Sequence, residues 1–154
     1  MSEKLKLKLE RLKTLILPSP PPIISVVEER DDTWIVQCLE GLKLIRFPLD
    51  GHYWLTDQNN FLNIVAWDWV DRKRYIVDRY DCENYAFSFK AHIDRFFGLN
   101  QVGIVLDYES GHGYNLVIFP SGNVMLYEPQ SDSLFFIPER NKQLYALENA
   151  TLLL

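Results

Sequence analysis

The chain has 154 residues and a formal net charge of −5 at pH 7, with 47% hydrophobic and 24% charged residues. This length fits a single domain, and the composition is that of an ordinary globular protein. The acidic balance argues against general nucleic-acid binding and against a polybasic membrane surface, and no apolar run approaches the ~20 residues that a membrane span needs. Two cysteines cannot form a disulfide framework, so we expect reduced thiols and a cytoplasmic or intracellular protein.

The N-terminal part is predicted to be a charged helix followed by a spacer. In residues 3–17, apolar residues recur at helical spacing, and lysines interrupt the apolar core that a signal peptide would need. We assign 1–17 to a helix that either packs on its own domain or contacts a partner or a second copy. Residues 18–22 (PSPPP) can be neither helix nor central strand, so they are predicted to be a stiff spacer before a single domain over 23–154.

The first half of that domain is predicted to be a mixed lobe. Residues 33–38 and 42–47 alternate or run apolar on either side of Gly41, which predicts a β-hairpin. Thr56 is predicted to cap a helix whose buried stripe lies within 61–65. Large aromatic residues close together favour a core or a cleft wall, and three of them gather here: Trp54, Trp67 and Trp69.

The second half is predicted to be one helix followed by an antiparallel sheet. An apolar stripe at spacings of three and four residues predicts a helix over 82–97, which Gly98 ends. This order indicates an α+β fold. The strand patterns after the helix are 102–108, 114–119 and 124–127, with a short strand near 135–137 and a last element of either kind over 144–154.

Cys82 lies in the first turn of the predicted helix. The unpaired backbone donors and the dipole at that position favour an anion, so we expect a lowered pKa and a nucleophilic thiolate. Cys38 ends a predicted strand with no helix start nearby, so it is expected to be structural.

A thiolate nucleophile needs a general acid or base, and a histidine base needs an orienting acceptor. His112 starts a strand between two glycines, which leaves room for a ligand beside its ring. His92 lies too far along the helix of Cys82, and His52, in a turn between the lobes, stays open. Glu128 closes the next apolar strand and is the first candidate for the acceptor, with Asp107 as the second.

The order of cysteine, histidine and acid, with the cysteine at a helix start and the other two on an antiparallel sheet, resembles papain-like and transglutaminase-like cysteine enzymes. More locally, 81–86 (DCENYA), 112–115 (HGYN) and 128–130 (EPQ) resemble the C-terminal domain of the fungal fairy-ring mushroom agglutinin family and its uncharacterised microbial and phage relatives. The resemblance covers about residues 54–137. The carbohydrate-binding lectin domain of that family has no counterpart in the sequence, by this comparison.

The resemblance implies a papain-like fold in which a central helix starts at the cysteine and packs on an antiparallel sheet. It also implies a calcium-dependent protease, with Cys82 as the nucleophile, His112 as the base and Glu128 as the residue that orients His112. Papain-like enzymes usually place a glutamine a few residues before the cysteine, and this sequence has none there. Gln58 is the candidate for that oxyanion donor, and Asn115 is a further supporting candidate.

Acidic residues crowd the predicted helix start. They could supply oxygen ligands to a calcium ion or simply match the helix dipole, and both interpretations stay open. Unneutralised carboxylates beside a thiolate would raise its pKa. The metal candidates are Asp78, Asp81 and Glu83.

The register of the hairpin between 114–119 and 124–127 tests the proposed triad. A tight turn centred between Ser121 and Gly122 would set Glu128 opposite Asn115, and not on the face of His112. The triad therefore predicts an irregularity in this hairpin. With a regular ladder, Asn115 or Asp107 would become the partner of the histidine.

The sequence thus predicts a cysteine peptidase or amidase that acts on a peptide or protein substrate through an acyl-enzyme intermediate. The alternative is a catalytically silent papain-like scaffold that serves as a protein-binding module. A histidine distant from Cys82, or a filled cleft, would favour the alternative. Nucleic acid and membrane are not expected as partners.

Overall fold

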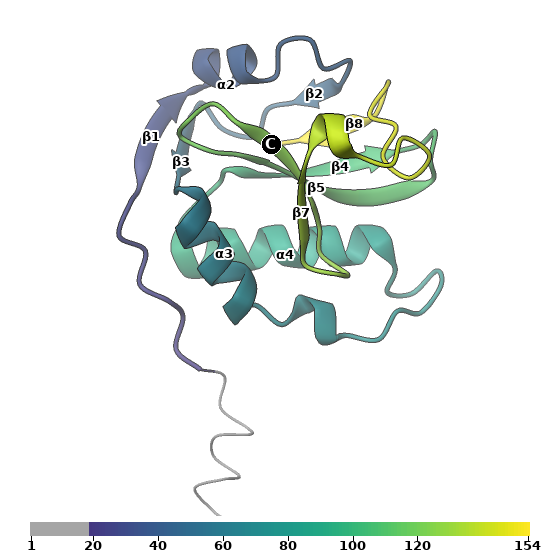
Figure 1. Cartoon of the computed structure of the whole chain (residues 1–154), viewed down its shortest axis with the longest axis horizontal. Coiled ribbons are helices and arrows are strands. Elements are labelled where there is room, and N and C mark those ends of the chain that lie inside the picture. The colour runs from purple at the N-terminus through teal and green to yellow at the C-terminus, as the bar shows by residue number, and fades with distance from the viewer. Residues whose placement is uncertain (1–18) are drawn as a thin grey trace, which may run out of the picture.

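The computed structural model describes residues 19–154, so the helix predicted over 1–17 lies outside the described residues. The predicted α+β class is confirmed (Figure 1). The helices are α2 (Asp32–Cys38), α3 (Gln58–Trp67) and α4 (Cys82–Phe97), with short 3-10 helices η1 (Val70–Arg72) and η2 (Ile137–Glu139). The strands are β1 (Glu28–Asp31), β2 (Ile45–Phe47), β3 (His52–Leu55), β4 (Val102–Asp107), β5 (His112–Ile118), β6 (Val124–Glu128), β7 (Ser133–Phe136) and β8 (Thr151–Leu153).

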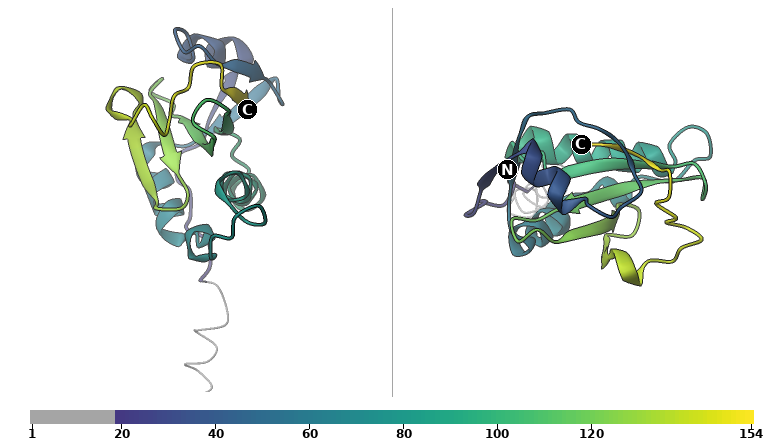
Figure 2. Two further views of the ribbon diagram at one scale, coloured as in Figure 1. Left: turned by 90° about the vertical axis from the view of Figure 1, so that its right-hand side faces the viewer. Right: turned by 90° about the horizontal axis from the view of Figure 1, so that it is seen from above.

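Six strands form the central sheet, in the order β2-β8-β4-β5-β6-β7. Its neighbouring strands are antiparallel except for β2 and β8, which run parallel. A separate antiparallel pair, β1 with β3, lies beside it. Helices α2 and α4 lie on opposite sides of the sheet (Figures 1 and 2). Within residues 19–154, no helix is both long and apolar enough to cross a membrane.

Each side of the sheet has its own hydrophobic core. On the α4 side, α3 and α4 pack on the sheet around the ring of Phe61, which meets those of Phe89 and Tyr127 edge to face at 5.9 Å and 5.6 Å. On the other side, Ile35 of α2 packs with residues of β3, β5 and the C-terminal segment. The strands between the two cores are therefore buried on both faces, and β5 takes part in both.

Helix α4 begins and ends where the sequence predicts. Its buried side chains, among them Tyr85, Phe89 and Ile93, recur at spacings of four residues and face the sheet. Gly98 ends the helix in the left-handed conformation, with φ of 62°. This helix positions Cys82 at the end of the sheet where β4 and β5 meet.

The hairpin predicted over 33–38 and 42–47 is wrong. Residues 32–38 form α2, because the side chain of Asp31 accepts a hydrogen bond from Trp34 N and caps a helix that buries Ile35. Strand β2 pairs in parallel with β8, more than 100 residues away in sequence, and not with its neighbour. The cap of α3 is likewise Asp57 and not Thr56.

Candidate functional site

Cys82 is the first residue of α4, as the sequence predicts, but its thiol is not activated there. Its sulfur lies 3.5 Å from Glu83 Oε2. Burial raises the pKa of the thiol and the Glu83 carboxylate adds to this, while backbone N–H groups of Gly113 and Glu83 act in the opposite direction. The expected low pKa is therefore wrong, because burial and a neighbouring carboxylate outweigh the helix start.

Gly113 of β5 packs directly against the first turn of α4. A methyl group at this position would lie 2.8 Å from Glu83 Cα and 2.9 Å from Glu83 N. Both are backbone atoms, so a larger side chain could be accommodated only by moving the strand or the helix. The glycine thus sets how closely the sheet approaches Cys82.

The side chain of His112 projects from the face of β5 that points away from α4. Side chains alternate along a strand, so His112 lies on the face of Tyr114, while Gly113 and Asn115 face α4. Its ring packs beside those of Tyr114, at 5.6 Å, and Tyr145, at 5.4 Å. Among residues 19–154, no hydrogen bond joins the His112 ring to the sulfur of Cys82.

The ring of His112 is held by Glu128. Its Nε2 lies 2.6 Å from Glu128 Oε2, and the buried carboxylate also accepts hydrogen bonds from the Tyr145 hydroxyl, at 3.0 Å, and from Gln130 N, at 3.2 Å. Because the carboxylate only accepts, this network assigns the proton to Nε2 and leaves Nδ1 as an acceptor when the ring is neutral.

The ladder between β5 and β6 is regular and has no bulge, and the length of the turn alone brings Glu128 to the face of His112. Phe119 N donates to Asn123 O, so three residues, 120–122, form the turn, with Gly122 at φ of 86°. Asn115 is paired with Tyr127, and the ladder continued would set Glu128 opposite Tyr114. Glu128 therefore shares the face of Tyr114 and His112.

The other candidates for the histidine's partner have structural roles. Asn115 is buried, and its Nδ2 donates to Ala86 O and Gly103 O, which links α4 to β4. Asp107 accepts hydrogen bonds from the backbone of the 109–110 turn and of residues 146–147. Burial alone would raise its pKa, but these hydrogen bonds lower it overall.

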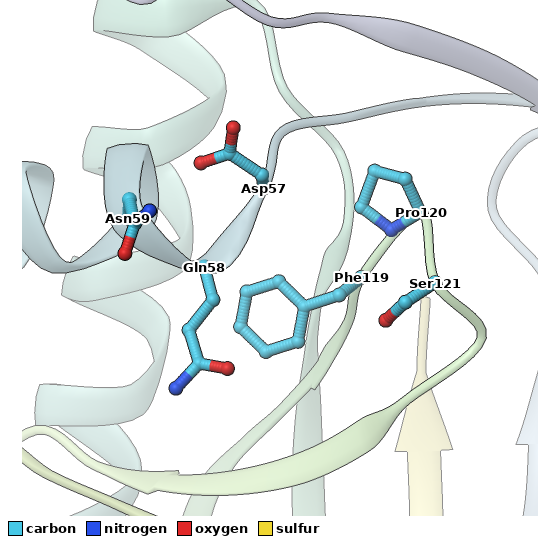
Figure 3. A pocket seen from close by; sticks show the side chains of 6 residues that line it. All are labelled: Asp57, Gln58, Asn59, Phe119, Pro120 and Ser121. Atoms are coloured by element: carbon cyan, nitrogen blue, oxygen red, sulfur yellow. The ribbon is translucent and has the colours of Figure 1, made fainter.

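Gln58 lines one cavity, shown in Figure 3, and Cys82 lines another. The cavity of Gln58 has a volume of about 500 Å³, between the start of α3 and the β5–β6 turn. It is lined by Asp57, Gln58, Asn59, Phe119, Pro120 and Ser121. The structure does not bring Gln58 to Cys82 as an oxyanion donor.

Cys82 and His112 do line one open pocket, of about 250 Å³. The side chain of Tyr108, 76% exposed, stands at this pocket. The sequence analysis missed Tyr108 and also Tyr145, which reaches the site from a segment with no periodic pattern. The lining residues are Cys82, Glu83, Leu106, Asp107, Tyr108, Gly111, His112 and Gly113.

The remaining candidates lie elsewhere or do not converge. His52 pairs with Glu29 at 2.9 Å, and His92 pairs with Asp68 at 2.7 Å. No group of three or more His, Cys, Asp or Glu side chains within residues 19–154 is arranged to hold a metal ion. The three acidic candidates for calcium, Asp78, Asp81 and Glu83, accordingly do not form such a group.

Comparison with known proteins relates the chain to lectins. Residues 25–137 match the family model of the ricin-type β-trefoil lectin C-terminal domain. A structure of PSL1a in complex with E64 is similar, with a TM-score of 0.65, 16% identity, and coverage of 82% of this chain and 51% of the other. Another is Polyporus squamosus lectin bound to the human-type influenza-binding epitope Neu5Acα2-6Galβ1-4GlcNAc, with a TM-score of 0.63, 15% identity, and coverage of 82% and 49%.

This chain spans about half the length of the structures that it matches. No curated protein matches the sequence at a significant level. The predicted link to a fungal lectin family agrees with these comparisons, but a papain-like peptidase is not supported by them.

The predictions of a cysteine peptidase or amidase, of an enzyme and of a hydrolase are therefore wrong. The matching family model is one of lectin domains, and the comparisons do not support a peptide substrate. The alternative of a binding module fits better. The match over residues 25–137 covers most of the sequence, and the chain belongs to the family of ricin-type β-trefoil lectin C-terminal domains.

Proposed function

We propose that this domain is a carbohydrate-binding module whose ligand occupies the pocket between Cys82 and His112. The observation that carries the proposal is a fixed imidazole beside an open pocket with an exposed aromatic ring. Glu128 holds His112 at 2.6 Å, and Tyr108 is exposed at the same pocket. Ligand sites commonly combine a few placed polar groups with aromatic surface.

The polar groups at this pocket suit a ligand rich in hydroxyl groups. With Nε2 of His112 donating to Glu128, Nδ1 is left to accept a hydrogen bond. The carboxylate of Glu83 is a second acceptor in the lining. Sugar hydroxyls supply such donors, and the apolar face of a sugar ring can pack on Tyr108. The volume of about 250 Å³ favours a single sugar residue inside the pocket.

The arrangement that resembles papain-like proteins would serve here as a scaffold. Helix α4 and β5 place Cys82 and His112 at one pocket, but the thiol pKa is raised and the imidazole projects from the other face of the strand. These features support binding without a thiolate nucleophile. Such a scaffold is the second of the two functions that the sequence suggests, with a carbohydrate in place of a protein as its ligand.

The family and the ligand named with one neighbour support a carbohydrate. The family is one of lectin domains, and Polyporus squamosus lectin is bound to a trisaccharide that contains Galβ1-4GlcNAc. That disaccharide is therefore a reasonable neutral probe for this chain.

The test is a titration of the ¹⁵N-labelled chain with Galβ1-4GlcNAc, followed by NMR. We expect saturable shifts at the amides of Tyr108, Gly111 and Gly113, which surround the pocket. Replacement of Tyr108 by alanine should weaken binding about fivefold, since aromatic packing contributes ~1 kcal/mol. Phe87→Ala is the matched control, because Phe87 is an exposed aromatic residue (45%) on α4 outside this pocket.

Two results would contradict the proposal. One is the absence of shifts around the pocket with a panel of neutral sugars at millimolar concentration. The other is equal loss of binding in Tyr108→Ala and Phe87→Ala, which would show that the ligand does not use this pocket.

A further inference from the structure

A second pocket, of about 360 Å³, lies where the segment after α3 packs on α4. It has no residue in common with the pocket of Cys82 and His112. Its chemistry is also different, because cationic and aromatic side chains dominate it. The lining residues are Trp69, Val70, Arg72, Lys73, Tyr80, Ser88 and His92.

The cations of this pocket form no ion pair with a carboxylate within residues 19–154. Neither Arg72 nor Lys73 forms an ion pair with any residue of the described chain, and both are exposed. The Lys73 ammonium lies 5.5 Å from the centre of the Tyr80 ring, which holds it at the pocket. Two positive charges are thus available to a negatively charged ligand.

Of the nearby acidic groups, Asp68 and Asp132 accept hydrogen bonds from other residues, and Asp71 precedes Arg72 in η1 but forms no ion pair with it. Asp68 is buried, accepts from Val70 N at 3.0 Å, and lies 2.7 Å from His92 Nδ1. Asp132 accepts the hydroxyl of Tyr127 at 2.7 Å. Since the Asp68 carboxylate only accepts, it fixes the His92 ring with its proton on Nδ1. The histidine is therefore an oriented polar group in the lining.

Trp69 supplies a flat apolar surface at the same place. Its side chain is 48% exposed, although tryptophan, as a large side chain, usually buries most of its surface. Trp67, two residues earlier, packs instead against Phe96 and Phe97 at 5.2 Å and 5.5 Å. The two tryptophans thus differ, since Trp67 packs on other aromatic rings while Trp69 is exposed beside the cations.

We propose that this pocket binds a sugar that carries a carboxylate, with the ring of the sugar on Trp69 and the carboxylate at Arg72 and Lys73. Guanidinium and ammonium groups bind carboxylates through charge-assisted hydrogen bonds. The aromatic face selects a ligand with an apolar ring face over a bare anion. The pocket is large enough for one sugar residue with its substituent.

The test compares two ligands that differ by one carboxylate, galacturonate and galactose, in NMR titrations of the full ¹⁵N-labelled chain. We expect saturable shifts of the Trp69 indole N–H and of the amides at 70–73 and 88–92. Galacturonate should bind roughly tenfold more tightly than galactose, because charge-assisted hydrogen bonds to its carboxylate are stronger than neutral ones.

The decisive variant is Arg72→Gln/Lys73→Gln. It should lower the affinity for galacturonate about tenfold and leave the affinity for galactose unchanged. The matched control is Arg74→Gln/Arg79→Gln, which removes the same charge from the same loop outside the pocket. Trp69→Ala should weaken binding of both sugars.

Three outcomes would overturn the proposal. Equal affinity for the two sugars would show that the carboxylate of the sugar does not contribute to binding. An equal loss of affinity for galacturonate in the two double variants would show that the effect comes from the net charge of the protein and not from Arg72 and Lys73. Inorganic phosphate that binds as tightly as galacturonate and shifts the same signals would indicate a site for simple anions. These outcomes can be distinguished from those for the pocket of His112, because the NMR signals of the two pockets belong to different residues.

Discussion

The two faces of β5 differ in what they accept. On the face toward α4, Gly113 leaves no room for even one methyl group beside Glu83. On the other face, His112 lies within a network of polar groups that ends in the buried carboxylate of Glu128. The face of Gly113 thus packs tightly on the first turn of α4, while the face of His112 holds one imidazole ring in a fixed position. Proximity to a shared pocket therefore does not make a thiol and an imidazole a catalytic pair.

The tight packing of Gly113 against α4 is expected to give the largest effect. Gly113→Ala should lower the free energy of unfolding by about 3 kcal/mol, because the new methyl group meets the backbone of Glu83 and cannot be relieved by a side-chain rotation. Urea denaturation measures the change. Gly51→Ala is the matched control, because a methyl group there meets no atom within 4 Å, and it should change stability by less than ~0.5 kcal/mol. A similar loss of stability in both variants would contradict the tight packing of Gly113 against α4.

The polar face should respond to the loss of its carboxylate. Glu128→Ala removes the acceptor of His112 Nε2, of the Tyr145 hydroxyl and of Gln130 N, and we expect a loss of about 2–3 kcal/mol. In the unmodified protein, ¹⁵N NMR of the His112 ring should find the proton on Nε2 when the ring is neutral. A ring with its proton on Nδ1, or a variant of unchanged stability, would disprove the network.

Asp107 joins the turn after β4 to the C-terminal segment and should make stability depend on pH. Asp107→Asn should cost about 2 kcal/mol at neutral pH, since an amide cannot accept all the backbone N–H groups that the carboxylate accepts. The folded-state pKa lies below the ordinary value of 3.8, so this contribution is present above that value and is lost as pH falls through the folded pKa.

Thermal unfolding of both proteins from pH 7 downward measures this dependence. The difference between them should shrink at the acidic end. Glu109→Gln, an exposed change in the same turn, serves as the control. A difference that stays constant through the acidic range would contradict the role of the ionised carboxylate.

The smallest effect concerns the two thiols. Burial raises the pKa of both Cys38 and Cys82, so iodoacetamide should label each more slowly than free cysteine at neutral pH, and faster as pH rises. Mass spectrometry of the labelled peptides gives the two rates. A Cys82 that reacts faster than free cysteine would mean that the helix start does activate it.

Local signals predicted the second half of the fold well. The bounds of α4 follow from its apolar stripe and from Gly98, and β4 to β6 follow from apolar runs separated by glycine-containing turns. The first half depended on distant partners. Residues 33–38 are apolar enough for a strand, but the cap at Asp31 and the burial of Ile35 make them a helix. No local pattern could pair β2 with β8.

The candidate site was predicted in part. The contact of Glu128 with His112 was predicted from the residues, but the irregular ladder expected for it is not found, because a three-residue turn gives the same result with a regular ladder. The face on which His112 lies depends on the alternation along β5, and the place of Gln58 depends on how α3 packs. Both positions depend on tertiary packing, for which the local sequence carries no pattern. The same holds for Tyr145, which closes the network from a remote loop.

The turn at 120–122 has one more consequence. Surface loops generally tolerate insertions and deletions. The length of this one, however, sets the register of β6 on β5, and so decides which side chains of β6 lie on the face of His112. Loss of a single residue would exchange the places of Tyr127 and Glu128, driving a carboxylate among the aromatic rings and leaving the imidazole without its acceptor. Natural relatives that keep this site should therefore vary in the composition of the turn far more than in its length.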